Sequence, residues 1–225
     1  MVFLKLRYRF LAGNCLNKNI VNLEPGRMIS KPRYINIKGR LLDLSVPLVM
    51  GVINVTPDSF YAGSRKVADN DIISAAGQML SEGADIIDVG GFSSRPGAKE
   101  IPSTEEQTRV LPAIKLISGT FPGAVISVDT YRAEVAHRAV TECGASIIND
   151  ISGGEADRDM FSVIAQLNVP YILMHMQGTP ETMQVNPVYN YVVADILMWF
   201  GERIIRLQSL GVKDIIIDPG FGFGK

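Results

Sequence analysis

Six short apolar runs, rich in isoleucine and valine, alternate with longer segments of helical periodicity along most of this 225-residue chain. Runs that are apolar on both faces are typical of buried parallel strands. Strands that alternate with helices predict an α/β fold with right-handed crossover connections. The predicted strands cover residues 48–55, 85–89, 124–129, 146–150, 171–176 and 214–218.

The segments between these runs predict helices, and a short hairpin precedes the first run. Helices are expected over residues 71–82, 131–143, 157–167 and 192–210, and one more begins at Ser103. Ser103, followed three residues later by Glu106, has the spacing of a capping box. Glycines at positions 83, 144 and 211 stand where three of the helices are expected to end. The hairpin is predicted over residues 34–44, with its turn at Gly39.

Polar residues at the ends of the strands decide between two α/β architectures. An open doubly wound sheet gathers its ligand groups near one switch point. A (β/α)8 barrel brings side chains from the carboxyl ends of many strands to one mouth. All six predicted strands end at or next to a polar residue or glycine, which favours the barrel: Asn54, residues 88–91, Asp129, Asn149 with Asp150, His175 and Asp218.

The chain supplies about six of the eight strand–helix units that a barrel needs. We therefore predict an incomplete (β/α)8 TIM barrel with an N-terminal β-hairpin, formed by residues 33–225 as one domain. Because two units are missing, the chain is expected to be a fragment or a truncated product. An unclosed barrel leaves two strand edges unpaired, so the isolated chain is expected to be poorly stable. Residues 1–32 are basic and are interpreted as a disordered leader or spurious extension, with a transit peptide as the alternative.

Composition excludes several classes of function. The chain has 22 basic and 23 acidic residues, and this balance predicts binding to neither nucleic acid nor an anionic membrane surface. No uncharged apolar stretch is long enough to span a bilayer. The two cysteines cannot form a disulfide framework, which favours a reducing, cytoplasmic location.

Three of the strand-end residues form the main candidate site. In a barrel, Asp129 and Asp218 would face each other across the mouth, with Asn149 between them. Two carboxylates and an amide in an apolar cup suit a flat heterocycle that carries N–H donors. The alternative is that each residue caps a helix or satisfies nearby backbone groups.

Loops after other strands carry weaker signals. Asn54 offers a neutral oxygen to a hydrated Mg²⁺ already held by phosphate, although an Asx turn before proline is equally compatible. The segment 92–97 combines hydroxyls with Arg95, which suits a phosphate or carboxylate, or an ordinary turn. The glycine-rich end, residues 218–225, matches neither a Walker A loop nor a dinucleotide-binding fingerprint. His175 is interpreted as structural rather than basic.

Taken in order, these motifs resemble dihydropteroate synthase, a pterin-binding TIM-barrel family of folate synthesis. The resemblance covers residues 34–225. It rests on VMGVINVTPDSF at 49–60, DVGGFSSRPG at 88–97, SVDT at 127–130, IIND at 147–150, LMHMQG at 173–178 and DPGFGFGK at 218–225. The family joins 4-aminobenzoate to 6-hydroxymethyl-7,8-dihydropterin diphosphate and releases diphosphate.

The resemblance implies a role for each matching residue. Asn54 would contact Mg²⁺ and the diphosphate, and Ser94, where the family usually has threonine, would contact the diphosphate. Phe92 replaces a common glutamate of that loop. The remaining implied contacts are to the pterin (Asp129, Asn149, Met174 and Asp218) and to aminobenzoate (Ser94, Arg95, Pro96 and Phe223).

The resemblance also implies groups beyond the sixth strand. The family carries a Ser-Arg-Lys motif after a seventh strand and an Arg-x-His motif after an eighth, and no such strands follow in this sequence. The chain alone is therefore expected to be inactive, while the full-length form is expected to be a homodimeric enzyme. Three alternatives stay open: a non-catalytic pterin-binding relic, a methyltetrahydrofolate-dependent methyltransferase, and an unrelated phosphate-binding barrel isomerase.

Overall fold

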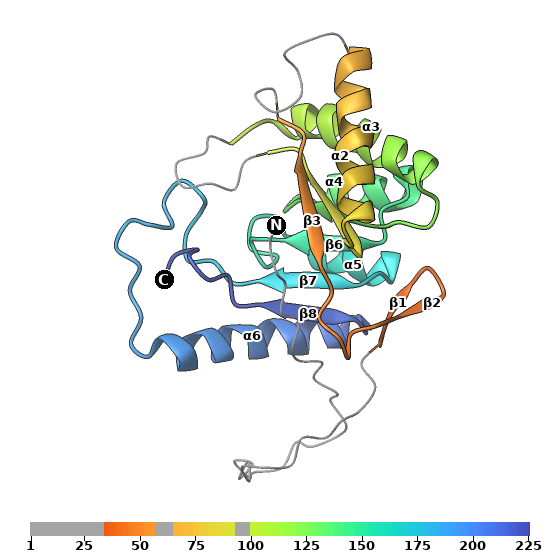
Figure 1. The fold of residues 1–225 in the computed structure, drawn as a ribbon. Helices are drawn as coiled ribbons and strands as arrows, with labels where there is room; N and C mark the ends of the chain where they lie inside the picture. Colours follow the sequence, from red (N-terminus) through yellow and green to blue (C-terminus); the bar gives the residue numbers. More distant parts are fainter. Residues whose placement is uncertain (1–33, 57–64, 93–99) are drawn as a thin grey trace.

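The computed structural model describes residues 34–56, 65–92 and 100–225. Six strands form one parallel sheet in which the order in space is the order in sequence, as consecutive strand–helix units require. The sheet curves, and its strands are β3 (Met50–Asn54), β4 (Ile86–Gly90), β5 (Val125–Asp129), β6 (Ile147–Asp150), β7 (Tyr171–Met174) and β8 (Ile215–Asp218) (Figure 1). The predicted α/β fold with parallel strands is confirmed.

Helices alternate with these strands and cover one face of the sheet (Figure 1). The main core lies between the strands and the helices, and it includes Ile87, Ile126 and Ile148 from the strands and Ile114 and Ile164 from the helices. The helices are α2 (Arg65–Ser81), α3 (Ser103–Thr120), α4 (Ala133–Arg138) with the π-helical turn η1 (Ala139–Cys143), α5 (Met160–Leu167) and α6 (Val192–Ser209).

The opposite face of the sheet is the inner face of an incomplete barrel. Near the amino ends of the strands, each strand contributes one buried apolar residue to a second core: Met50, Ile86, Val125, Ile147, Ile172 and Ile216. The predicted hairpin, β1 (Tyr34–Ile37) with β2 (Arg40–Asp43), covers this end and buries Ile35 and Ile37 against that core. The carboxyl ends of the strands are therefore where the inner face can meet a ligand.

The helical segment formed by α4 and η1 ends at Gly144, as predicted. Gly144 has a φ of +99°, and its N–H donates back to the Ala139 carbonyl. A side chain is strained in this left-handed conformation, so glycine marks the end of the helix in the sequence.

The predicted capping box at the start of α3 is wrong. Pro102 precedes the helix, and no side chain of the described residues caps it. The Ser103 hydroxyl instead accepts a hydrogen bond from Gln107, while Glu106 is fully buried and turns toward Thr130 and Arg132.

Among the described residues, no helix is long and apolar enough to cross a bilayer.

Candidate functional site

The register of the sheet decides which polar residues face inward. Side chains alternate between the two faces of a strand, so residues two apart from the inner core residues share its face. On β4, Asp88 and Gly90 follow inward-facing Ile86, and on β5, Ser127 and Asp129 follow Val125. The same count places Asn54, Asn149, Met174 and Asp218 on the inner face.

Asp88 and Asn149 contact each other across the intervening strand β5. The Asn149 Nδ2 atom donates to Asp88 Oδ2 at 3.0 Å. Ser127 occupies the position on β5 opposite Asp88, and this small side chain leaves room for the contact. Asp88 is not among the pterin residues predicted from the sequence, although its even spacing from Ile86 is a signal that places it on the inner face.

Asn54 and Asp129 flank Gly90, one inward-facing position nearer the mouth than Asp88. A Cβ atom on Gly90 would lie 3.3 Å from Asn54 Oδ1 and 3.2 Å from Asp129 Oδ2. Glycine therefore allows an amide oxygen from β3 and a carboxylate from β5 to approach each other above β4.

Burial of carboxylates on the inner face is electrostatically unfavourable for the protein without a ligand. Burial raises the pKa of Asp129 well above its ordinary range, and the nearby carboxylates of Asp88, Glu106 and Asp150 add to the effect. Burial also raises the pKa of Asp88, against the opposing influence of Ser127 and Asn149. Three buried oxygens have no hydrogen-bond partner among the described residues: Asp88 Oδ1, Ser127 Oγ and Asp129 Oδ1. Such atoms mark a place where a ligand with N–H groups would gain hydrogen bonds.

Asp218 is tied partly to its own loop. Its Oδ1 atom accepts from the Gly220 N–H at 2.8 Å, so the alternative that it satisfies backbone is correct for one oxygen. Burial raises the pKa of Asp218, while Gly220 and the Lys225 ammonium act in the opposite direction. A Cβ on Gly220 would lie 3.2 Å from Met174 Cγ, so the loop after β8 packs against the end of β7.

Lys225 holds the glycine-rich loop in place. Its Nζ atom donates to the carbonyls of His175 and Phe223, each at 2.9 Å. Phe223 thereby packs against an apolar cluster at the mouth that contains Phe92, Met174 and Met176. The loop that carries Phe223 is thus fixed beside Asp218.

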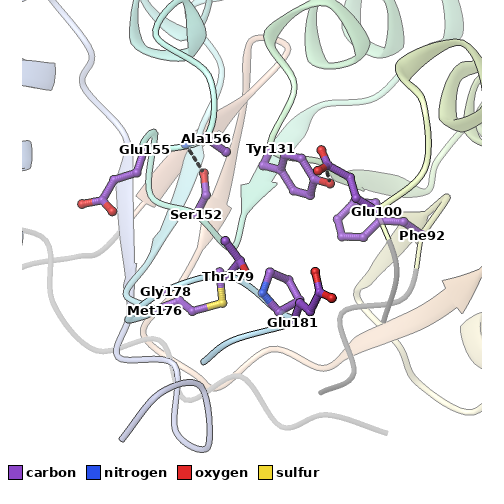
Figure 2. A pocket seen from close by; sticks show the side chains of 11 residues that line it. Phe92, Glu100, Tyr131, Ser152, Glu155, Ala156, Met176, Gly178, Thr179 and Glu181 are labelled. Carbon is purple, nitrogen blue, oxygen red and sulfur yellow. Dashed lines mark hydrogen bonds between the residues drawn. The ribbon is translucent and has the colours of Figure 1, made fainter. Parts of the chain in front are cut away.

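A cavity of about 520 Å³ opens beside this cluster, at the carboxyl ends of β4 to β7. The Phe92 and Tyr131 rings lie together on one side of the cavity, and Ser152, Met176 and Thr179 lie on the other side (Figure 2). The Phe92 and Tyr131 rings meet edge to face, with centroids 4.9 Å apart. The predicted pterin residues do not line this cavity among the described residues, so it adjoins the inward-facing site rather than containing it.

Two strand-end residues counted toward the mouth in fact face outward. His175 packs its ring against Trp199 of α6, with centroids 4.8 Å apart, and burial lowers its pKa to about 4. Asp150 accepts hydrogen bonds from Ser152 and from the Tyr171 hydroxyl. Both lie one residue past an inward-facing position, and alternation turns them toward the helices. The interpretation of His175 as structural is consistent with this packing.

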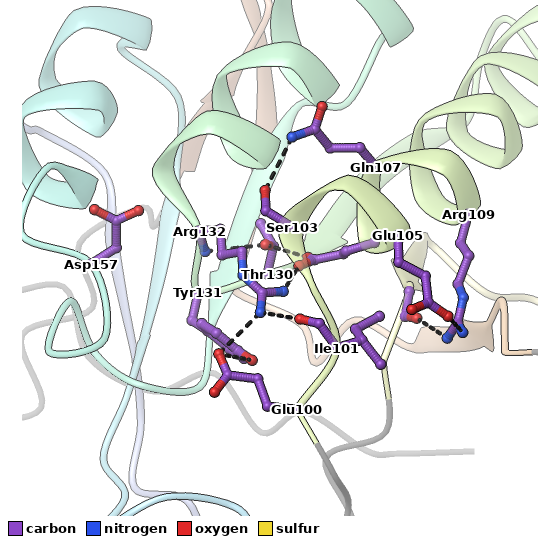
Figure 3. A network of polar contacts seen from close by, with 12 residues as sticks. Glu100, Ile101, Ser103, Glu105, Gln107, Arg109, Thr130, Tyr131, Arg132 and Asp157 are labelled. Carbon is purple, nitrogen blue, oxygen red and sulfur yellow. Dashed lines mark hydrogen bonds and ion pairs between the residues drawn. The ribbon is translucent and has the colours of Figure 1, made fainter.

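A buried ion pair holds the segment that follows Asp129. Arg132 pairs with Glu106, and the Thr130 hydroxyl donates to Glu106 at 2.6 Å. Arg132 also binds Glu100 and the Ile101 carbonyl (Figure 3). The network joins the end of β5 to the start of α3, and sequence spacing could not reveal it because the partners in each contact lie more than 20 residues apart.

The described residues offer little to a metal ion by themselves. They contain no group of three or more His, Cys, Asp or Glu side chains that could hold one. Asn54 is exposed at the mouth and contributes one neutral oxygen beside Asp129. This donor set fits a Mg²⁺ that is carried by phosphate oxygens and touches the protein at one or two points.

Several predicted residues cannot be placed. Ser94, Arg95 and Pro96 lie outside the described residues, as does the leader 1–32. Their proposed contacts with diphosphate and aminobenzoate stay predictions.

Comparison with known proteins identifies the family. The model of the family described as "Pterin binding enzyme" matches residues 50–225. The chain belongs to the pterin-binding enzyme family. This membership accounts for the order of the six strands and for the polar inner face at their carboxyl ends.

Members of the pterin-binding family with known names and structures are similar to most of the chain. Dihydropteroate synthase of Escherichia coli is 45% identical over 190 residues, which cover 84% of this chain and 66% of that protein. The Yersinia pestis dihydropteroate synthase, solved with a sulfonamide drug complex, aligns with a TM-score of 0.77 at 39% identity, over 86% of this chain and 70% of that one. The Xanthomonas albilineans enzyme, solved with 4-aminobenzoic acid, gives 0.77 at 38% identity, over 87% and 69%.

The chain therefore contains a large part of the pterin-binding fold. The chain spans two thirds or less of the length of the curated relatives that it matches. The prediction of an incomplete TIM barrel is confirmed, because the chain with its six-stranded parallel sheet aligns with 70% of the Yersinia pestis structure.

Proposed function

We propose that this chain forms the pterin-binding part of a dihydropteroate synthase. The observation that carries the proposal is the inward-facing group of Asp129, Asn149 and Asp218, in which Asp129 Oδ1 is buried and has no hydrogen-bond partner among the described residues. A pterin ring is flat and presents an amino group and ring N–H groups along its edges, which complement such oxygens. A charge-assisted hydrogen bond to a buried carboxylate contributes about 1.5–3 kcal/mol.

The reaction that this site would serve joins 4-aminobenzoate to 6-hydroxymethyl-7,8-dihydropterin diphosphate. The amine nitrogen forms a bond to the exocyclic carbon of the pterin, the carbon–oxygen bond to diphosphate breaks, and the nitrogen loses a proton. The similarity to named dihydropteroate synthases supports both substrates.

The residues of this chain would contact different parts of the substrates, according to their position in the site. Asp129, Asn149 and Asp218 would hold the ring, with Met174 against it, and the charge on Asp129 would favour positive charge that develops on the pterin as diphosphate leaves. Asn54, beside Asp129, would meet the diphosphate and its Mg²⁺. A bound Mg²⁺ would neutralise charge on the leaving group. Phe223 would line the aminobenzoate side, and Ser94, Arg95 and Pro96 would complete it.

The similarity to dihydropteroate synthases and the composition of the chain support proposals for its partners and location. We propose small-molecule substrates, a cytoplasmic location, and a homodimer for the longer protein. Neither nucleic acid nor a membrane surface is expected as a partner, since the charges of the chain are balanced.

The test is equilibrium binding of 6-hydroxymethyl-7,8-dihydropterin diphosphate with Mg²⁺ to the 225-residue chain, measured by titration calorimetry. We expect saturable binding to one site, at least ten-fold weaker in Asp218→Asn. The same samples, supplied with 4-aminobenzoate, are expected to form no dihydropteroate, because the implied lysine and Arg-x-His groups are not in this sequence. Absence of pterin binding in the folded chain would contradict the proposal.

A further inference from the structure

Asp88 is an unusual residue for the middle of a buried strand. Its side chain is 3% exposed and lies between Ile86 and Gly90 on the inner face of β4. A buried carboxylate is costly unless hydrogen bonds or charges compensate for the lost water. The structure gives it one hydrogen bond, from Asn149, and leaves its Oδ1 atom without a partner among the described residues.

This hydrogen bond fixes the orientation of the Asn149 side chain. An ionised carboxylate only accepts hydrogen bonds, so the amide must turn its NH₂ group toward Asp88. The amide is planar, and its oxygen lies on the opposite arm from its nitrogen. Fixing Nδ2 at 3.0 Å from Asp88 Oδ2 therefore fixes Asn149 Oδ1 as well. No hydrogen bond given for the described residues uses that oxygen, which leaves it able to accept from a ligand.

We propose that Asp88 is a positioning residue, which holds the Asn149 carboxamide with its oxygen toward the ligand and so selects a heterocycle with an N–H donor at that point. This inference rests on the proposed function, because it names how the same site chooses its ligand. Without Asp88 the amide is free to rotate by half a turn. In the rotated orientation it presents NH₂ to the ligand N–H, so that two donors face each other, and this orientation competes with the one that binds.

The positions of the neighbours favour an indirect role for Asp88. It lies one inward-facing residue deeper in the barrel than Gly90, which is level with Asn54 and Asp129. Asn149 is level with Asp129 and is less buried than Asp88. A ligand that enters from the mouth therefore meets Asn149 before it can meet Asp88.

A double-mutant cycle separates this indirect role from direct contact. The affinity of 6-hydroxymethylpterin is measured by calorimetry for the wild type, Asp88→Ala, Asn149→Ala and the double variant. We expect Asp88→Ala to weaken binding at least ten-fold, and to have less than three-fold effect once Asn149 is alanine, because coupled residues are not additive. Equal effects of Asp88→Ala in both backgrounds would overturn the proposal.

Asp150→Ala is the matched control. It removes a buried, hydrogen-bonded carboxylate from the position next to Asn149, but on the outer face of the sheet. It is expected to lower the thermal midpoint and to leave pterin affinity within three-fold of the wild type. If Asp150→Ala weakens binding as much as Asp88→Ala does, general destabilisation explains both and the positioning role is excluded.

A second measurement needs no ligand, and it separates failure of this proposal from failure of the proposed function. The side-chain NH₂ resonances of Asn149, identified by their loss in Asn149→Ala, report the hydrogen bond directly. We expect Asp88→Ala to move them to positions typical of a freely exposed amide, and the isosteric Asp88→Asn to move them less. Unchanged resonances in Asp88→Asn or Asp88→Ala would overturn the positioning role, whatever the wild type binds. If Asp88→Ala does not fold, Asp88→Asn carries the measurement.

Discussion

Asn54 Oδ1 and Asp129 Oδ2 flank Gly90, at 3.3 and 3.2 Å from the position that a Cβ atom there would take. At the mouth of the inner face, β3 thus contributes an amide oxygen and β5 a carboxylate oxygen. Gly90 on β4, between them, leaves the space that they occupy. This space lets the groups that we propose for the diphosphate and for the pterin ring lie side by side.

Substitution of Gly90 tests this arrangement. We expect Gly90→Ala to push the two oxygens apart, to destabilise the fold by about 1–3 kcal/mol through overpacking, and to weaken binding of the pterin diphosphate at least ten-fold. Thermal unfolding and calorimetric titration check the two effects. Gly201→Ala, in helix α6 with open space around its Cβ position, is the matched control and is expected to leave binding unchanged.

Asp129 is expected to stabilise the ligand complex at the expense of the free protein. Asp129→Asn removes a buried charge whose Oδ1 atom has no hydrogen-bond partner in the described part of the chain. The variant should unfold at the same or a higher temperature than the wild type, while its pterin affinity falls by about 1.5–3 kcal/mol, the worth of a charge-assisted hydrogen bond. A lower midpoint together with unchanged affinity would show that Asp129 serves the fold instead.

The pH dependence of stability follows from the same carboxylate. Burial and neighbouring carboxylates raise the pKa of Asp129 above its ordinary value of 3.8, so the folded state holds the proton more tightly than the unfolded state. Stability contributed by Asp129 therefore falls as pH rises from about 4 toward neutrality. We expect the unfolding midpoint of Asp129→Asn to exceed that of the wild type most at pH 7 and least near pH 4. An advantage that grows on acidification would contradict the assignment.

The Arg132–Glu106 pair is predicted to be the most sensitive ion pair in the described part of the chain. Glu106 is fully buried, so Arg132→Met leaves a buried charge without its cation and should cost about 3–5 kcal/mol in denaturant unfolding. Adding Glu106→Leu should recover part of the loss. Arg138→Met breaks an exposed pair with Glu142 and is expected to change stability little. Equal effects of the two arginine variants would refute the distinction.

The fold was predictable because its signals repeat. Each strand–helix unit carries an apolar run, a helical segment and a polar strand end, so an error in one unit does not change the architecture. The orientation of individual side chains was harder. His175 and Asp150 follow strands just as Asp129 does, but they lie at odd spacing from the inner isoleucines and point toward the helices. Counting by twos from Ile86 would have included Asp88.

Long-range polar contacts could not be predicted from spacing. Glu106 fits a local capping pattern with Ser103, yet its partners come from the loop after β5. Contacts with the Arg132 guanidinium and the Thr130 hydroxyl, away from solvent, stabilise Glu106 more than a capping hydrogen bond would, because water can take the place of a cap. Roles for Ser94, Arg95 and Pro96 rest on the resemblance, since these residues lie outside the described part of the chain.

A crystal structure of this chain with 6-hydroxymethylpterin measures the central claim most directly. The account predicts the ring on the inner face of the barrel, with N–H groups hydrogen-bonded to Asp129 and Asp218 and to Asn149 Oδ1. A ring bound instead in the cavity between Tyr131 and Met176, with no contact to these three side chains, would contradict it.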